Sequence, residues 1–238
     1  MKLDCLVVAA HPDDAEIGIG GTLLRLKRAG AKIGIVDLTR GEMGSRGSRQ
    51  DRDAETAAAD RVLQTDVRLN LQQPDSRVQV SVEAREELAG IFRRHAPDVV
   101  IAHHVDDLHP DHVAAGQLAK EAWYLSGLRR MAEAAGETAR RPPHLFHFFG
   151  HLATSPTLVV DVGEVWQQKE ELIRCYNSQL VPDGDQDEGK HFLFGADILE
   201  RVRTKARYWG EQIGAKLGEP LLHAGPLPVD DPLRRLLS

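Results

Sequence analysis

The sequence predicts an α/β fold of three layers, in which helices flank a largely parallel sheet. Short apolar runs alternate along the chain with segments of helical periodicity, and this alternation is typical of βαβ units. The apolar runs are continuous rather than interrupted at every second residue, as expected of strands that are covered on both faces. The chain has 238 residues, enough to bury a sizeable core around such a sheet.

Six apolar runs are the expected strands. The first, CLVVAA at 5–10, leads directly into a histidine, and the second is IGIVDL at 33–38. The remaining strands are expected at 67–71, 98–104, 145–151 and 157–162.

Segments of helical periodicity separate these runs. In 16–31 the apolar residues recur at helical spacing, and Gly30 is a signal for the end of the helix. The other expected helices are 53–64, 83–95, 111–125, 164–177 and 197–213.

The connections are polar. The segment 39–52 is rich in glycine and charge and is expected to be a loop, as are 130–143 and 181–190. The last of these belongs to a lid-like segment at 181–200. No shift in composition marks a domain boundary. We therefore expect 1–238 to form one domain, whose C-terminal part, about 164–238, is mainly helical.

Composition and charge argue against several classes of protein. The formal net charge is −6 and the sequence pI is about 6.0, which gives no electrostatic case for binding nucleic acid. The N-terminal apolar run is too short for a membrane span and lacks the layout of a signal peptide. Cys5 and Cys175 form neither a disulfide framework nor a CxxC zinc motif, which fits a cytoplasmic protein.

Three polar clusters follow expected strands. They are HPDD at 11–14, the charged segment 39–52, and HHVDDLHPDH at 103–112. The carboxyl ends of parallel strands share one edge of the sheet, which is where ligands bind in open α/β folds. We therefore expect the three clusters to line one pocket.

The motifs HPDD and HPDH place similar residue types at the same spacing. His11 and Asp14 are three residues apart, as are His109 and His112, and residues at this spacing face the same way in the first turn of a helix. A proline follows the leading histidine of each motif, where the start of a helix tolerates it. Each motif is thus expected to display polar side chains where a strand ends and a helix begins.

Together the two motifs predict a catalytic metal site. Ligands from His11 and Asp14, with a histidine from HPDH, leave a fourth position open, as in catalytic zinc sites. Asp13 is a candidate base, and His109, oriented by Asp111, is a candidate acid or oxyanion donor. A helix-capping role explains either motif alone, but two such motifs, each after a strand, favour the metal site.

Other polar and glycine-rich features point less clearly to chemistry. GIGG at 18–21 lacks the G-x-G-x-x-G pattern of a dinucleotide site, and close packing of the helix on the sheet is the better interpretation. His103 and His104 are expected to be packed or solvent-facing, with a role behind the metal ligands as the alternative. His147 and His151 are expected to be structural.

The chain resembles the PIG-L/LmbE-like de-N-acetylases. The resemblance rests on AAHPDDAEIGIGGTL, LTRGEMGSRGSRQDRDAE, HPDH and LVVDVGEVWQQKEELIRCYNSQ, and it spans Leu3 to about Leu222. Within the family, the chain is most similar to the bacterial deacetylases that act on N-acetylglucosaminyl-malate in bacillithiol biosynthesis.

The resemblance implies a Rossmann-like fold and a zinc hydrolase that removes acetyl from an N-acetylglucosamine unit. It also implies one Zn²⁺ per chain, although other divalent ions suit similar sites, and a homo-oligomer of up to six chains. The implied site residues are His11, Asp14 and His112 for the metal, Asp13, His109 and Asp111 for catalysis, and Arg52 for substrate binding.

The chain departs from the family pattern in two places. The YAEPF or YAEGF segment of many bacterial relatives is LGEPL at 217–221, and HFLFGADILE at 191–200 has no tyrosine where some relatives have one. Three functions are alternatives to a deacetylase of the malate conjugate. They are a deacetylase of N-acetylglucosamine or chitooligosaccharides, a metal-dependent sugar-binding module without turnover, and a nucleotide-binding protein without a metal.

Overall fold

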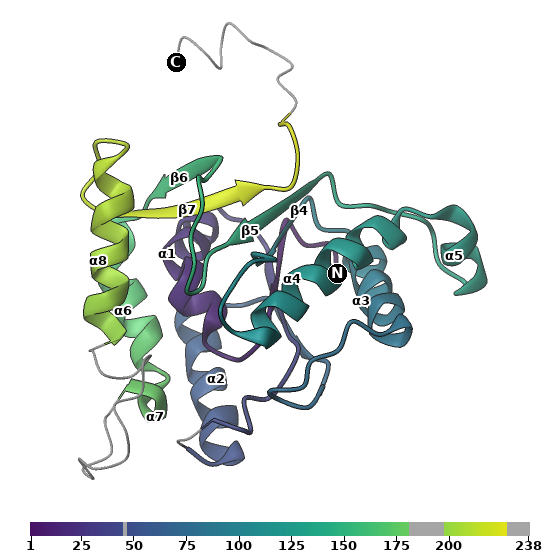
Figure 1. Ribbon diagram of the computed structural model, residues 1–238, viewed down its shortest axis with the longest axis horizontal. Coiled ribbons are helices and arrows are strands. Elements are labelled where there is room, and N and C mark those ends of the chain that lie inside the picture. Colours follow the sequence, from purple (N-terminus) through teal and green to yellow (C-terminus); the bar gives the residue numbers. More distant parts are fainter. Residues whose placement is uncertain (45–46, 181–197, 228–238) are drawn as a thin grey trace, which may run out of the picture.

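The computed structural model describes residues 1–44, 47–180 and 198–227, and it confirms the three-layer α/β/α arrangement (Figure 1). Within these residues the sheet has seven strands, in the order β3-β2-β1-β4-β5-β7-β6. Strands β1 to β5 run parallel, and β7 runs antiparallel to both of its neighbours. The strands are β1 (Cys5–Ala9), β2 (Ile33–Asp37), β3 (Val67–Asn70), β4 (Val99–His103), β5 (His144–Phe148), β6 (Leu158–Asp161) and β7 (Gly218–His223).

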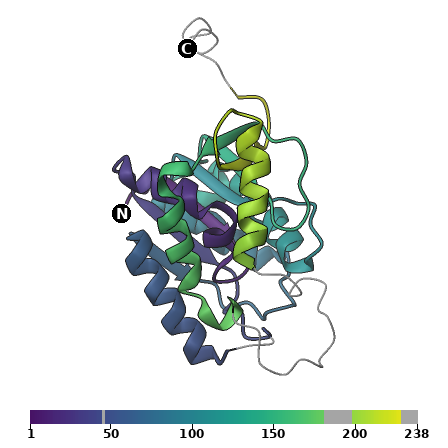
Figure 2. The ribbon, with the colours of Figure 1, turned by 90° about the vertical axis from the view of Figure 1, so that its left-hand side faces the viewer.

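Helices cover both faces of the sheet. Helices α1, α2, α6 and α8 lie on one face, where α6 packs on α1 and α2 (Figure 2), and α3 and α4 cover the other face. The helices are α1 (Asp14–Arg28), α2 (Arg49–Leu63), α3 (Val82–His95), α4 (Pro110–Ser126), α5 (Arg129–Ala134), the 3₁₀ turn η1 (Gly163–Val165), α6 (Trp166–Arg174), α7 (Asn177–Leu180) and α8 (Ile198–Glu211). In the described part of the chain, no helix has the length and apolar character that crossing a membrane requires.

Two apolar cores, one on each face, explain the continuous apolar runs of the strands. In β1, Cys5, Val7 and Ala9 pack into the core beneath α1 and α6, whereas Leu6 and Val8 pack into the core beneath α3 and α4. Both sets of side chains are buried. A central parallel strand therefore has no polar face to show in its sequence.

Three elements differ from the sequence expectation. Helix α2 begins at Arg49, inside the expected loop, because Ser48 and Asp51 form a capping box that precedes the apolar positions. Helix α5 occupies part of the expected loop 130–143. Strand β7 lies in the C-terminal part that was expected to be mainly helical, and its glycine, glutamate and proline gave no strand signal. Residues 181–197 of the expected lid-like segment lie outside the described residues.

Helix α1 is kinked at Ile19, whose φ of −136° and ψ of 19° are not helical. The kink leaves backbone N–H groups without their usual acceptors inside the helix, so these groups need other partners. Glu219 from β7 accepts from the N–H of Gly21 at 2.9 Å and from the N–H and hydroxyl of Thr22 at 2.6 Å each. A carboxylate from the far end of the chain thus caps the second part of this helix.

Lys169 of α6 also stabilises the kinked segment of α1. Its Nζ donates to the carbonyl of Ile17 at 2.9 Å and to Glu219 at 2.5 Å, and both charged side chains are almost fully buried. Gly21 permits the close approach, since a Cβ there would lie 2.8 Å from Glu219 and from Val162. The expected role of the glycines in close packing is confirmed.

Lys169→Met is expected to destabilise the protein by about 3–5 kcal/mol, because it leaves the Glu219 carboxylate buried without its counter-charge. Chemical denaturation measures the change. The matched control is Lys2→Met, which breaks the exposed pair with Asp98 and should cost about 1 kcal/mol or less. Equal effects of the two substitutions would contradict the role given to Lys169.

Candidate metal centre

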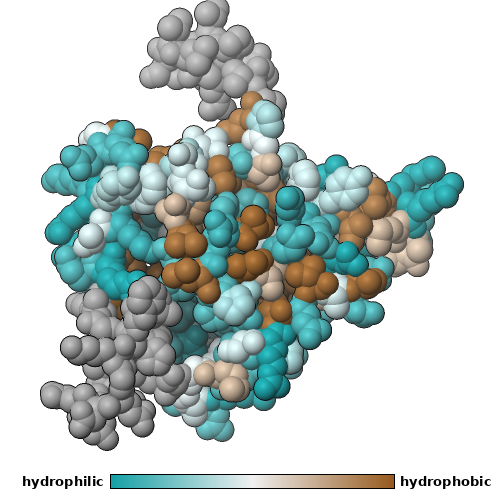
Figure 3. All heavy atoms as spheres, in the orientation of Figure 1, coloured by the Kyte–Doolittle hydropathy of each residue, from teal (hydrophilic) through white to brown (hydrophobic). Residues whose placement is uncertain are grey.

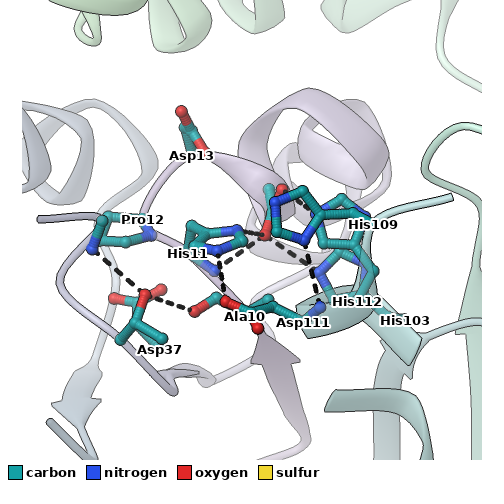
Figure 4. A network of polar contacts seen from close by, with 12 residues as sticks. Ala10, His11, Pro12, Asp13, Asp37, His103, His109, Asp111 and His112 are labelled. Carbon is teal, nitrogen blue, oxygen red and sulfur yellow. Dashed lines mark hydrogen bonds and ion pairs between the residues drawn. The ribbon is translucent and has the colours of Figure 1, made fainter. Parts of the chain in front are cut away.

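The two motifs meet at the carboxyl ends of β1 and β4 (Figure 4). HPDD joins β1 to α1, HPDH begins α4, and His103 is the last residue of β4. They border a pocket of about 680 Å³, and Figure 3 shows a recess in this face of the molecule. Of the predicted residues, those that line the pocket are His11, Asp13, Asp14, Arg52, His109 and His112.

Asp14 lies at the centre of the cluster. Its Oδ2 is 3.2 Å from Nδ1 of His11, and its Oδ1 is 3.3 Å from Nε2 of His112. One donor atom from each of the three residues lies within 4.8 Å of the others. A carboxylate and two imidazoles are a ligand set that suits zinc and similar divalent ions, and this spacing fits such an ion.

The second ring nitrogen of each histidine faces a carboxylate. Nε2 of His11 is 3.2 Å from Asp75 and 3.3 Å from Asp111, and Nδ1 of His112 is 3.1 Å from Asp107. Because an ionised carboxylate can only accept, these nitrogens carry the protons. The opposite nitrogens, which face Asp14, are therefore the ones that would coordinate a metal ion, with a carboxylate behind each histidine as in known metal sites.

The local charges favour a cation. Burial lowers the pKa of His112, but Asp14 and Asp107 outweigh it and raise this pKa to about 9. Burial likewise opposes protonation of His11, yet Asp111, Asp14 and Asp75 raise its pKa well above the usual value. Positive charge is thus stabilised between these carboxylates.

His103 belongs to the centre, although sequence reasoning favoured a packed role for it. Its ring is buried, stacks on His112 with centroids 4.0 Å apart, and places Nε2 3.1 Å from Oδ2 of Asp14. Burial and the nearby His112 lower the pKa of His103 to about 4, so it is a neutral donor that orients the Asp14 carboxylate. The sequence feature that could have identified His103 is its position in HHVDDLHPDH, at the end of an expected strand.

Asp13 occupies a strained turn between β1 and α1. Its φ is 114°, in the left-handed region that side chains other than glycine rarely adopt. In Figure 4 its carboxylate points away from the histidine rings. Burial raises the pKa of Asp13 to about 7, with Asp14 and Glu16 adding to the rise and Arg52 opposing it. A carboxylate with such a pKa is suited to accept a proton near neutral pH.

Arg52 holds this turn. Both of its terminal nitrogens lie 3.3 Å from Asp13, and one of them donates to the carbonyl of Pro12 at 2.5 Å. The residue is only 4% exposed, and its guanidinium packs over the ring of Tyr176. Arg52 borders the pocket as expected, but its contacts are to the candidate base.

His109 caps helix α4. Its Nδ1 accepts the backbone N–H of Asp111 at 3.2 Å, so Nε2 carries the proton of the neutral ring and can donate. The ring lies 4.9 Å from His11 and 4.7 Å from His112, centroid to centroid. His109 is therefore a hydrogen-bond donor beside the candidate metal ligands.

The Asp111 carboxylate is placed differently from the expectation. It accepts from the backbone N–H groups of Ser76 and Val78, at 2.7 and 3.2 Å, and faces Nε2 of His11. Asp111 thus orients His11 through its carboxylate and His109 through its backbone N–H. Nothing in the sequence marked Asp75, which reaches His11 from the loop after β3.

Comparisons with known proteins cover the part of the chain that holds this site. The family model described as GlcNAc-PI de-N-acetylase, PIG-L, matches residues 6–123, which include both motifs. Diacetylchitobiose deacetylase of Thermococcus kodakarensis is 27% identical over 235 residues, covering 90% of this chain and 80% of the relative.

Two solved structures are also similar. The conserved protein TT1542 from Thermus thermophilus superposes with a TM-score of 0.82 at 40% identity, over 95% of this chain and 96% of that one. The hydratase GalB, which acts on 4-carboxy-2-hydroxymuconate in Pseudomonas putida, has a TM-score of 0.77 at 23% identity, over 97% and 99% of the two chains. The latter shows a shared fold alone, so the reaction has to be argued from the site.

Asp111→Asn is expected to weaken zinc binding about 10- to 100-fold, because Nε2 of His11 loses a carboxylate partner. Isothermal titration calorimetry of the metal-free protein measures the affinity. The control, Asp106→Asn, changes an exposed neighbour of the motif and should leave the affinity unchanged. An Asp111→Asn protein with full affinity would show that this carboxylate does not support the metal site.

Proposed function

Because the chain belongs to the PIG-L (GlcNAc-PI de-N-acetylase) family of amide hydrolases, we propose that it is a zinc-dependent de-N-acetylase. Its substrate is a small molecule that contains N-acetylglucosamine, and its products are acetate and the free amine. The observation that carries the proposal is the division of roles around Asp14. His11 and His112 provide ligand nitrogens, Asp13 is a base, and His109 is a donor.

Each residue of the site has a role in amide hydrolysis. His11, Asp14 and His112 would hold the ion, which when bound supplies Lewis acidity to the acetamide carbonyl and to water. Asp13 accepts the proton of the attacking water. His109 donates from Nε2 to the developing oxyanion, and a proton then passes to the leaving amine.

We propose N-acetylglucosaminyl-malate, an intermediate of bacillithiol biosynthesis, as the substrate. Arg52, which the resemblance implies as a substrate-binding residue, is paired with Asp13. Lys205 of α8 lines the same pocket, where its Nζ donates to the carbonyl of Gly150 at 2.6 Å, so it brings a positive charge to the edge of the site. A cytoplasmic location and a homo-oligomer of up to six chains belong to the same proposal, and light scattering after size-exclusion chromatography measures the oligomeric state.

Deacetylation of N-acetylglucosamine or chitooligosaccharides is the second candidate, and the Thermococcus relative named diacetylchitobiose deacetylase favours it. An acetate-release assay of the zinc-loaded protein distinguishes the two. The panel contains N-acetylglucosaminyl-malate, N-acetylglucosamine and diacetylchitobiose. A preference for the malate conjugate supports our proposal, and tight binding with no acetate release from any compound would indicate a sugar-binding module.

Asp13→Asn is expected to lower kcat about 10²- to 10⁴-fold without changing zinc content, because the amide cannot accept the proton. Acetate release and elemental analysis provide the two readouts. Asp53→Asn, on the exposed side of α2, is the matched control and should retain activity. Full activity of Asp13→Asn on the preferred substrate would refute the mechanism.

The pH dependence of kcat/KM should follow the ionisation of Asp13. The base works only when deprotonated, so activity falls as the pH drops through its pKa, about 7. Arg52→Gln removes a positive charge that lowers this pKa, so the acidic limb should move about 1 pH unit upward. Arg52→Lys keeps the positive charge and should shift the acidic limb of the pH profile less. A downward shift in Arg52→Gln would contradict the assignment.

A further inference from the structure

Asp107 and His151 form a second carboxylate–imidazole pair beside the candidate metal centre. His151 follows β5 in the sequence FFGH, and Asp107 lies in the loop between β4 and α4. Oδ1 of Asp107 is 2.7 Å from Nδ1 of His151 and 3.1 Å from Nδ1 of His112. One buried carboxylate oxygen therefore serves two imidazoles.

The chain is shaped to bring His151 to this place. A Cβ on Gly150 would lie 2.7 Å from Oδ2 of Asp107 and 2.9 Å from Nδ1 of His112, so only glycine allows the approach. The next backbone N–H, that of His151, donates to Oδ2 of Asp107 at 2.7 Å. The His151 ring then stacks on His112, with centroids 5.3 Å apart and planes at 13°, and borders the pocket.

The Asp107 contact also fixes which nitrogen of His151 carries the proton. An ionised carboxylate only accepts, so Nδ1 donates and Nε2 of the neutral ring is an acceptor. Within the described ranges, no protein group pairs with Nε2 of His151. The side chain is 19% exposed and borders the pocket.

We propose that His151 is a specificity-determining residue, whose Nε2 accepts a hydrogen bond from the sugar hydroxyl next to the acetamide. Asp107 is the positioning residue that holds His151 and the candidate ligand His112 in one arrangement. The inference rests on the proposed function and adds a recognition contact to it.

The chemistry of the pocket favours a hydroxyl as the partner. In an N-acetylglucosamine unit, the 3-hydroxyl is on the carbon next to the one that bears the acetamide. His151 stacks directly on His112, so it lies one side chain away from the ligand set that faces the acetamide. Among the other acceptors that line the pocket, Asp13 and Asp14 have other roles in the mechanism and Asp75 faces Nε2 of His11 at 3.2 Å. Nε2 of His151 has no partner among the described residues and can accept from this hydroxyl.

A second metal ion between Asp107, His112 and His151 is the competing explanation, since their donor atoms also lie within 4.8 Å. It would require His112 to lose its Nδ1 proton while Nε2 faces Asp14. It would also displace the hydrogen bond between His151 and Asp107. Hydrogen bonding satisfies all of these groups without either loss.

The test compares two substrates, the methyl glycoside of N-acetylglucosamine and its 3-deoxy analogue, by acetate release from zinc-loaded protein. In the wild type, loss of the hydroxyl should lower kcat/KM about 10- to 100-fold, the usual range for an unpaired buried hydrogen-bonding group. His151→Ala should lower kcat/KM by a similar factor on the hydroxylated substrate and should no longer distinguish the two. His151→Gln, which keeps an acceptor oxygen, should restore part of the discrimination.

Zinc affinity, measured by calorimetry, should be the same in His151→Ala and in the wild type. His144→Ala, a histidine substitution on β5 outside the site, controls for general damage. If His151→Ala slows both substrates equally, or if it loses zinc affinity, the inference is overturned in favour of a structural or metal-binding role. If the wild type releases no acetate from the hydroxylated glycoside or the panel above, the proposed function itself fails and the inference fails with it.

Discussion

The position of one carboxylate, that of Asp14, determines the rest of the site. Imidazoles from His11, His103 and His112 face it from the ends of two strands and the start of α4. Three rings meet one carboxylate only because Asp14 begins α1 directly after the strained residue Asp13. Backbone strain of this kind persists when surrounding contacts hold it, and it is common at functional sites.

The contacts that hold the turn come from distant parts of the chain. Arg52 of α2 donates to the carbonyl of Pro12 and to the carboxylate of Asp13. The pair of Lys169 and Glu219 holds the kink further along α1. Glu16 is fully buried on the same helix, paired with Arg68 at 2.7 Å and with the hydroxyl of Tyr176 at 3.0 Å. Buried charges are costly unless they are paired, so these ion pairs specify one geometry of the turn.

The sequence predicted the parallel strands and the two motifs because both depend on local patterns. Apolar runs and i, i+3 spacing are visible without knowledge of the fold. The groups behind the motifs were less visible, because Asp75 and Glu219 reach them through long-range contacts that leave no period in the sequence. The contact of Asp111 with His11 was missed for the same reason, since the two lie 100 residues apart.

We propose that a single divalent ion binds between Nδ1 of His11, the Asp14 carboxylate and Nε2 of His112. Anomalous diffraction at the zinc absorption edge, from crystals of the zinc-loaded protein, locates the ion directly. We predict one strong peak per chain within about 2.0–2.2 Å of these ligand atoms. A peak between Asp107, His112 and His151 with none beside Asp14, or no peak in zinc-loaded protein, would contradict the account.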